Sequence, residues 1–422
     1  MLRPLAVLAL LVSLIATAMA EPSRALDDNA DSIAIVVGNR DYKQTTPVDY
    51  AHNDADAIRD YLVRGLGFRD SNVFLLKDAT LNELNQAFGS EANPQGGRLW
   101  RSVTAGRSNV FVYYSGHGAP DLKTRQPFLL PQDGDPNFSE SGFALETLYR
   151  NLELVKQKVG PDRQVIVMVD ACFTGETGRR GENMLAVSAP GFSPAKPKAG
   201  AGILRLAATS GATPANWDDG ARLGLFTSRF LMAAAGLANP NGPASPAGAE
   251  TRRVAWSDLQ SYVTREVRDA ARREVGREQE PEIEVAALSL PQVEPAPAIR
   301  RVFDLARDEA QWRAAEADGS REALERYVAQ CGEPCAYRRQ AMDRLLKRNR
   351  DAAARKDDED WRRLSAEGRY QAYLDGCGKV CAYRPLALGY LGKDVETPPA
   401  PPPSATTPPP VAPDATSAEH AA

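Results

Sequence analysis

The chain has 422 residues, more than one typical domain of about 150 residues, and its length predicts two or three domains. Its formal net charge is −4 and its pI is near 5.7, so it has no overall basic field of the kind that attracts nucleic acid or an anionic membrane. A site for a charged substrate must therefore be local.

The first twenty residues predict an export signal. Arg3 precedes an apolar run, and Ala18-Met19-Ala20 supplies the small residues typical of a cleavage site. The run is shorter than the roughly 20 residues of a comfortable membrane span, so an uncleaved anchor is the less favoured alternative. We expect residues 1–20 to be removed, leaving a periplasmic or secreted protein without an integral membrane segment.

Residues 32–289 predict an α/β domain. Short apolar runs without period-two alternation are typical of strands in a mostly parallel sheet that helices cover on both faces. Helical spacing indicates a helix from Ala51 to Leu62 and another from near Ser257 to Gly276. The predicted strands are 33–37, 72–76, 109–114, 165–169 and 203–207.

The remaining segments differ in composition. Residues 178–202 are rich in Gly, Pro and Ala without periodicity and predict a surface loop, and residues 290–298 predict a linker. Residues 299–393 contain an internal repeat rich in Ala, Arg, Glu and Leu, which predicts a pair of small helical hairpins. Residues 396–422 are dominated by Pro, Ala, Thr and Ser and predict a disordered tail.

The five cysteines divide into two close pairs and one single residue. Each copy of the repeat holds one pair, Cys331 with Cys335 and Cys377 with Cys381. In an oxidising compartment we expect two disulfides, with a four-thiolate zinc site as the less favoured alternative. Cys172 then remains as a free thiol, for which catalysis and a buried structural role are the two explanations.

A nucleophilic thiol needs a base, and the chain offers three histidines. His420 lies in the predicted tail, and His52 begins a predicted helix, where a surface or capping role is the ordinary explanation. His117 follows the strand 109–114 within Ser115-Gly116-His117-Gly118, and Cys172 follows the strand 165–169. If these strands are parallel neighbours, both side chains emerge at the same sheet edge.

With these motifs, residues 32–289 resemble the caspase and metacaspase clan of cysteine peptidases. The histidine lies 55 residues before the cysteine, close to the caspase-type spacing of about 50. The resemblance implies a caspase-like sheet, a Cys172 nucleophile, a His117 base, and an oxyanion hole formed by the backbone N–H groups of Gly118 and Cys172. It rests on the motifs at 35–39, 53–54, 115–118, 170–175, 207–210 and 224–227.

The resemblance also implies a substrate pocket. Asp54, Ser115 and Asp170 match metacaspase pocket positions, so the chain is expected to be an endopeptidase that cleaves after Arg or Lys. Caspases carry Gln where this chain has Asp170, which disfavours cleavage after Asp. The alternatives are that Asp54 caps its helix, that Asp170 orients a loop, and that the preferred residue is neutral or acidic.

No cofactor or metal is expected. Asp133, Asp135 and Glu146 give only a loose version of the aspartate cluster found in calcium-dependent metacaspases, so calcium activation stays an open alternative. Self-processing in 178–202 is a further hypothesis, because this loop contains Arg179 and other basic residues.

The expected partners are peptide or protein substrates, not nucleic acid, and the C-terminal repeats are expected to contact another protein. A catalytically silent caspase-like scaffold is the alternative function. Silent relatives commonly lose the cysteine or the histidine, whereas this chain has both Cys172 and His117, which favours the enzyme.

Overall fold

The computed structural model describes residues 28–174, 202–210, 213–239, 253–284, 286, 288–295, 299–332 and 335–393. The predicted signal at 1–20, nearly all of the predicted loop at 178–202 and the predicted tail at 396–422 lie outside these residues. Within them, no helix combines the length and hydropathy that a membrane span requires.

A six-stranded sheet forms the centre of the first domain, in the order β12-β8-β7-β3-β1-β2. All neighbouring strands are parallel except the edge strand β12, which is antiparallel to β8. The five predicted strands are confirmed, with ends displaced by at most one residue. The strands are β1 (Ile33–Gly38), β2 (Val73–Lys77), β3 (Val110–Ser115), β7 (Val165–Asp170), β8 (Ile203–Ala207) and β12 (Glu282–Ile283).

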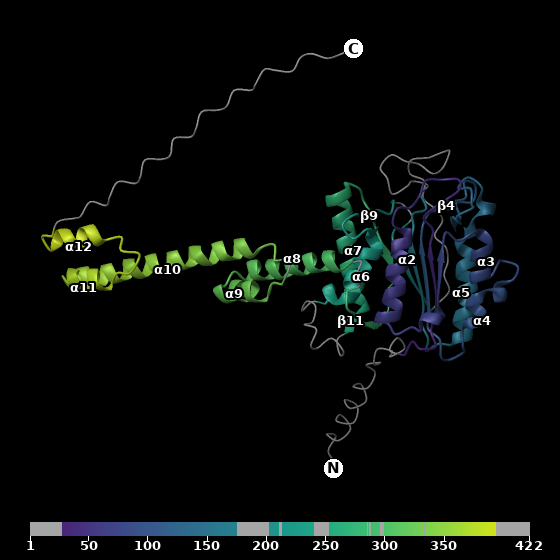
Figure 1. The fold of residues 1–422 in the computed structure, drawn as a ribbon, viewed down its shortest axis with the longest axis horizontal. Helices are drawn as coiled ribbons and strands as arrows, with labels where there is room; N and C mark the ends of the chain where they lie inside the picture. Colours follow the sequence, from purple (N-terminus) through teal and green to yellow (C-terminus); the bar gives the residue numbers. More distant parts are fainter. Residues whose placement is uncertain are drawn as a thin grey trace, which may run out of the picture. The chain divides into compact units, whose positions relative to one another are not determined.

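Helices cover both faces of this sheet, as the lack of alternation predicts (Figure 1). Ala34 and Val36 of β1 pack in the core under α2, α6 and α7, whereas Ile33, Ile35 and Val37 pack in the core under α3, α4 and α5. The helices are α2 (Ala51–Asp60), α3 (Leu81–Phe88), α4 (Arg98–Ser102), α5 (Leu145–Val159), α6 (Leu225–Met232) and α7 (Trp256–Ala270).

Several helices of the first domain end in π-helical turns. The turns are η1 (Tyr61–Gly65) after α2, η5 (Ala233–Leu237) after α6 and η7 (Ala271–Val275) after α7. Gly276 adopts a left-handed conformation with φ of 67° and ends the last of these turns, as predicted from its position.

Small antiparallel sheets, which the sequence patterns do not predict, flank the main sheet. They are β4-β5-β6, β9-β10 and β11-β13. Their strands are β4 (Gly118–Pro120), β5 (Pro127–Leu129), β6 (Phe143–Ala144), β9 (Trp217–Asp218), β10 (Leu223–Gly224), β11 (Arg253–Ala255) and β13 (Ser289–Pro291).

The C-terminal region is helical. Its helices are α8 (Arg300–Asp318), α9 (Arg321–Gln330), α10 (Arg338–Ala366), α11 (Tyr370–Gly376) and α12 (Arg384–Tyr390). The chain divides into two compact units, the first holding residues up to Asp318 together with Gln330–Tyr337 and the second holding Gly319–Ala329 and the residues from Arg338 onward.

The sequence repeat corresponds to a repeated packing arrangement. In the first copy, Asp308 accepts a hydrogen bond from the backbone N–H of Ala336 at 2.8 Å, and the ring of Trp312 stacks on Tyr337. Both cysteine pairs form disulfides, Cys331–Cys335 and Cys377–Cys381, as expected.

The second copy repeats these contacts. Asp357 accepts a hydrogen bond from the N–H of Ala382, also at 2.8 Å, and the ring of Trp361 stacks on Tyr383 at 5.2 Å between centroids. A buried aspartate thus holds the backbone that follows the disulfide in each copy. The two copies are therefore equivalent structural modules rather than a coincidence of composition.

Candidate active site

Strand pairing brings the two chemically interesting side chains to one edge of the sheet. The strands β3 and β7 are parallel neighbours, and their last residues, Ser115 and Asp170, face each other in register. His117 and Cys172 each follow two residues later. Both line the same pocket, as the sequence predicts for parallel neighbouring strands.

The pocket also collects the other predicted side chains. Asp54 from α2, Ser115 and Asp170 all line it beside Cys172 and His117. Its volume is about 20 Å³, room for about one water molecule.

The His117 backbone is clamped by tyrosines. The phenol oxygen of Tyr42 accepts the N–H of His117 at 2.7 Å, and the hydroxyl of Tyr114 donates to its carbonyl, also at 2.7 Å. The Tyr42 ring also lies 4.9 Å from the His117 ring, between centroids. These contacts fix the imidazole relative to the sheet.

Glycines on either side of His117 make these close approaches possible. A Cβ atom at Gly116 would lie 2.5 Å from the hydroxyl of Tyr42, and one at Gly118 would lie 2.4 Å from the ring of Phe173. The same atom at Gly118 would lie 2.8 Å from the carbonyl oxygen of Cys172. The backbone of Gly118 therefore runs directly against that of Cys172, which any side chain would prevent.

The imidazole of His117 is 3% exposed. Burial lowers its pKa from 6.5 to about 4, and a backbone contact to Thr46 offsets part of the change. Nε2 lies 2.9 Å from the carbonyl oxygen of Thr46, which can only accept a hydrogen bond. We therefore assign the proton to Nε2, which leaves the lone pair on Nδ1.

Cys172 is 5% exposed and lies outside the two disulfides that the other four cysteines form. It is thus both buried and at a pocket wall. The sequence left a structural and a catalytic role open, and the pocket it shares with His117 is the observation that bears on the choice.

Asp54 and Asp170 bring two buried carboxyl groups together. Oδ2 of Asp54 accepts a hydrogen bond from the hydroxyl of Ser115, and Oδ1 accepts the N–H of Gly224, both at 2.7 Å. Oδ2 of Asp170 accepts both the hydroxyl and the N–H of Thr227. A Cβ atom at Gly224 would lie within 3.2 Å of both carboxyl groups, which places them side by side.

Burial makes these carboxyl groups hard to ionise. It raises the pKa of Asp170 to about 6, although the hydrogen bonds from Thr227 act in the opposite direction. Burial, followed by repulsion from Asp170, also raises the pKa of Asp54 well above its ordinary value. Two carboxylates without a cation between them are unfavourable, so the pair favours a positively charged occupant.

Motif reasoning missed several residues at this pocket. The loop and short strands that precede α6 contribute Asn216 and Trp217, which line the pocket together with Gly224 of the motif at 224–227. The side-chain oxygen of Asn216 is buried and has no hydrogen-bond partner within the described residues. The side-chain nitrogen of the same amide donates to Gln279. No motif marks these residues; the only signal is an Asn-Trp pair shortly before the Gly224 motif.

The other predicted residues lie elsewhere. Asp133 accepts the N–H of Leu81, which starts α3, and Asp135 accepts the N–H of Asn137. His52 lies on α2 with Nε2 2.9 Å from Oδ1 of Asp78, which also accepts the N–H groups of Arg40 and Asp41.

A family model described as the caspase domain matches residues 31–290, more than half of the chain. No curated protein sequence matches the chain.

Two solved structures are similar to the chain. Caspase-1 from Spodoptera frugiperda is 14% identical, with a TM-score of 0.43, over 66% of this chain and 96% of that one. A protein from Geobacter sulfurreducens is 17% identical, with a TM-score of 0.38, over 64% of this chain and 96% of that one.

Proposed function

Because the chain belongs to the caspase-domain family, which supports a cysteine peptidase-like function in general, we propose that it is an endopeptidase that cleaves after Arg or Lys. Cys172 is the nucleophile and His117 is its base. The observation that carries the proposal is the shared pocket: the thiol of Cys172 and the imidazole of His117 follow the paired ends of β7 and β3 and line the same cavity.

The protonation of His117 suits a base. Its low pKa keeps the resting imidazole neutral at pH 7, and the contact of Nε2 with Thr46 leaves Nδ1 as the atom that can accept a proton. Nδ1 takes the proton of the Cys172 thiol as the sulfur attacks the substrate carbonyl carbon. Because the imidazole is clamped by Tyr42, little reorganisation is needed for this transfer.

The following steps return the site to its starting state. Attack gives a tetrahedral oxyanion, for which the family resemblance assigns the N–H groups of Gly118 and Cys172 as donors. Collapse breaks the C–N bond, and the protonated His117 gives its proton to the leaving amine, which leaves a thioester on Cys172. Water then attacks the thioester, His117 accepts one of its protons and returns it to the departing sulfur, and the acid product leaves.

The acceptors of the pocket support a basic substrate residue. Asp54 and Asp170 supply carboxylate oxygens, and the side-chain oxygen of Asn216, which has no partner in the described part of the chain, supplies a third acceptor. A guanidinium presents five N–H donors in a fixed planar arrangement and would satisfy several of these atoms at once. Its charge would lower the pKa of both carboxyl groups and remove the repulsion between them.

The pocket must widen to admit such a side chain, because its volume is about 20 Å³. The half-buried Trp217 lines it from the short strand β9, and its ring contacts Tyr50 edge to face at 6.1 Å between centroids. We propose that this aromatic wall moves outward when substrate binds. The proposal therefore includes an opening step before chemistry.

Fluorogenic peptides ending in Arg, Lys, Asp or Leu test the function. We expect turnover after Arg and Lys only, and loss of at least a thousandfold in Cys172→Ala and in His117→Ala. His52→Ala is the matched control, because His52 lies beside Asp78 and does not line the pocket. Equal turnover in wild type and Cys172→Ala would refute the assignment of Cys172 as the nucleophile.

The assay also separates the alternatives. Turnover after Asp or Leu would show that the chain is a peptidase with a specificity other than the proposed one. No turnover of any peptide by wild-type protein, with and without calcium, would support the silent scaffold. The two disulfides fit an oxidising compartment, so we also propose export to the periplasm or the medium, with the repeats contacting a protein partner.

A further inference from the structure

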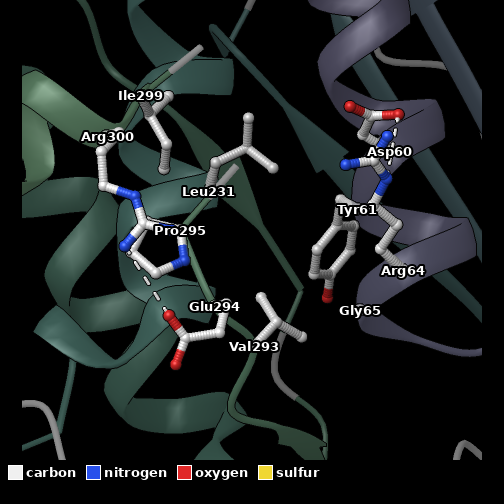
Figure 2. A pocket seen from close by; sticks show the side chains of 10 residues that line it. All are labelled: Asp60, Tyr61, Arg64, Gly65, Leu231, Val293, Glu294, Pro295, Ile299 and Arg300. Atoms are coloured by element: carbon white, nitrogen blue, oxygen red, sulfur yellow. Dashed lines mark ion pairs between the residues drawn. The ribbon is translucent and has the colours of Figure 1, made fainter. Parts of the chain in front are cut away.

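A second cavity lies at the other end of α2, the helix that contributes Asp54 to the Cys172 pocket. Asp54 near the start of α2 lines the first pocket, whereas Asp60 and Tyr61, where α2 passes into η1, line the second. Leu231 of α6 lies across from them (Figure 2). The volume of this cavity is about 200 Å³, ample for a small organic molecule.

The walls of this cavity are mainly apolar. Leu231, Ile299 and Pro295 lie on one side and the ring of Tyr61 on the other, with Val293 of the segment after β13 between them (Figure 2). Engineered apolar cavities of about 150 Å³ bind benzene, so this space suits one ring or a branched aliphatic group. The body of a ligand would therefore be apolar.

Tyr61 lines this cavity, but its hydroxyl is covered by neighbouring residues, so a ligand oxygen reaches it only if the cavity wall shifts. Its side chain is 3% exposed, and its ring packs edge to face on Phe230 at 5.5 Å between centroids. Its hydroxyl is buried and has no hydrogen-bond partner among the residues that the structure describes. Burial raises the pKa of this phenol, so it stays protonated and can donate. A buried donor without an acceptor is costly, and a ligand oxygen would satisfy it.

Two guanidinium groups lie at the rim. Arg64 is 3.9 Å from Asp60, and Arg300 is 3.7 Å from Glu294. Both arginine side chains are largely exposed, with 72% and 53% of their surface accessible, so these long ion pairs contribute little and either arginine can turn toward a ligand. A ligand amine could pair with Asp60 or Glu294 but would leave the Tyr61 proton without an acceptor.

We propose that this cavity binds a small organic acid, with an apolar ring or branched chain against Leu231 and Ile299 and a carboxylate that accepts from Tyr61 and the rim arginines. A carboxylate fits because it offers acceptors to both kinds of donor, and charged acceptors make the stronger hydrogen bonds. The site is separate from the Cys172 pocket and does not depend on peptidase activity.

Titration calorimetry with 4-phenylbutyrate tests the proposal on the full chain carrying Cys172→Ala, which excludes turnover as a source of heat. We expect binding of one molecule per chain. The alcohol 4-phenylbutanol should bind about tenfold more weakly, because it lacks the charged acceptor. The amine 4-phenylbutylamine should not bind measurably, and an amine that binds as tightly as the acid would overturn the assignment of the ligand class.

Two further variants locate the binding. Tyr61→Phe removes the hydroxyl alone and should weaken 4-phenylbutyrate about tenfold. It should unfold at no lower temperature than its parent, because the hydroxyl makes no hydrogen bond in the described structure. Val293→Trp should abolish binding by filling the cavity. Tyr149→Phe, which removes the hydroxyl of a buried tyrosine on α5, is the matched control and should bind normally. Unchanged affinity in Tyr61→Phe would refute the proposal.

Discussion

Replacement of Asp170 by Asn should stabilise the protein while destroying its proposed specificity. Burial raises the pKa of Asp170 from about 3.8 to about 6, a difference of about 2 units. At about 1.4 kcal/mol per unit, the ionised carboxylate costs the folded state about 3 kcal/mol at pH 7. Asn has nearly the same shape, can still accept from Thr227 through its oxygen, and carries no charge.

The sign of this effect depends on pH. Because the folded pKa is above the unfolded value, the folded state binds the Asp170 proton more tightly, and the stability that this proton provides is complete below about pH 4. It is lost as the pH rises through 6. The advantage of Asp170→Asn over wild type should therefore grow from near zero at pH 4 to about 3 kcal/mol at pH 7. For a domain of this size, that corresponds to a rise in Tm of roughly 6 to 12 °C.

Thermal unfolding from pH 4 to 8 measures this difference. Asp162→Asn is the matched control, because Asp162 is exposed in the turn before β7, and its curve should follow wild type at every pH. Turnover of an Arg peptide by Asp170→Asn should fall at least a hundredfold through a higher KM. A variant that is less stable than wild type at pH 7, or equally stabilised at pH 4 and 7, would refute the reasoning.

Three other predictions concern the same domain and the repeats. The KM for an Arg peptide should fall about tenfold between pH 5 and 7, as Asp170 ionises above its pKa of about 6, and a flat KM would contradict the proposed pocket. In Tyr42→Phe the buried N–H of His117 loses its acceptor, so kcat should fall about tenfold with KM unchanged; a change in KM alone would argue against a positioning role. Cys377→Ser opens a five-residue loop, and we expect it to lower the stability of the second unit by about 2 kcal/mol in chemical denaturation while leaving kcat of the peptidase domain unaltered.

The central sheet was predictable because its strands are continuous apolar runs. Residues 33–37 and 165–169 are buried on both faces, and their composition alone indicates this. The edge strand β12 was missed because it has two residues, Glu282 and Ile283, and forms through pairing with β8 rather than through its own strand propensity. A single sequence does not indicate with which strand a short segment pairs or in what register.

The C-terminal region was predicted as helical, but its detail differs. The sequence suggested two separate small hairpins, whereas α10 continues without interruption from Arg338 to Ala366. This stretch contains neither Gly nor Pro, so no residue ends the helix between the two copies of the repeat. The stacked pairs Trp312–Tyr337 and Trp361–Tyr383 show that the sequence repeat reflects repeated packing.

Only the residues of the candidate site that belong to sequence motifs could be predicted. His117 and Cys172 were found because each follows a strong strand, and Asp54 was found through the family resemblance. Tyr42 and Asn216 were missed because they come from segments without a motif and reach the site through tertiary packing. That the side-chain oxygen of Asn216 lacks a hydrogen-bond partner among the residues the structure describes follows from the fold and not from any motif.

The pairing of Ser115 with Asp170 shows that the number of residues between His117 and Cys172 is distinct from the distance of each residue from the end of its strand. The 55-residue interval between histidine and cysteine includes the connections before and after α5, whose lengths the paired strand ends do not fix. The site requires only that the histidine and the cysteine each lie two residues after the ends of two strands that pair in register. Distant relatives should therefore be sought by that double offset, with the length of the intervening crossover left unconstrained.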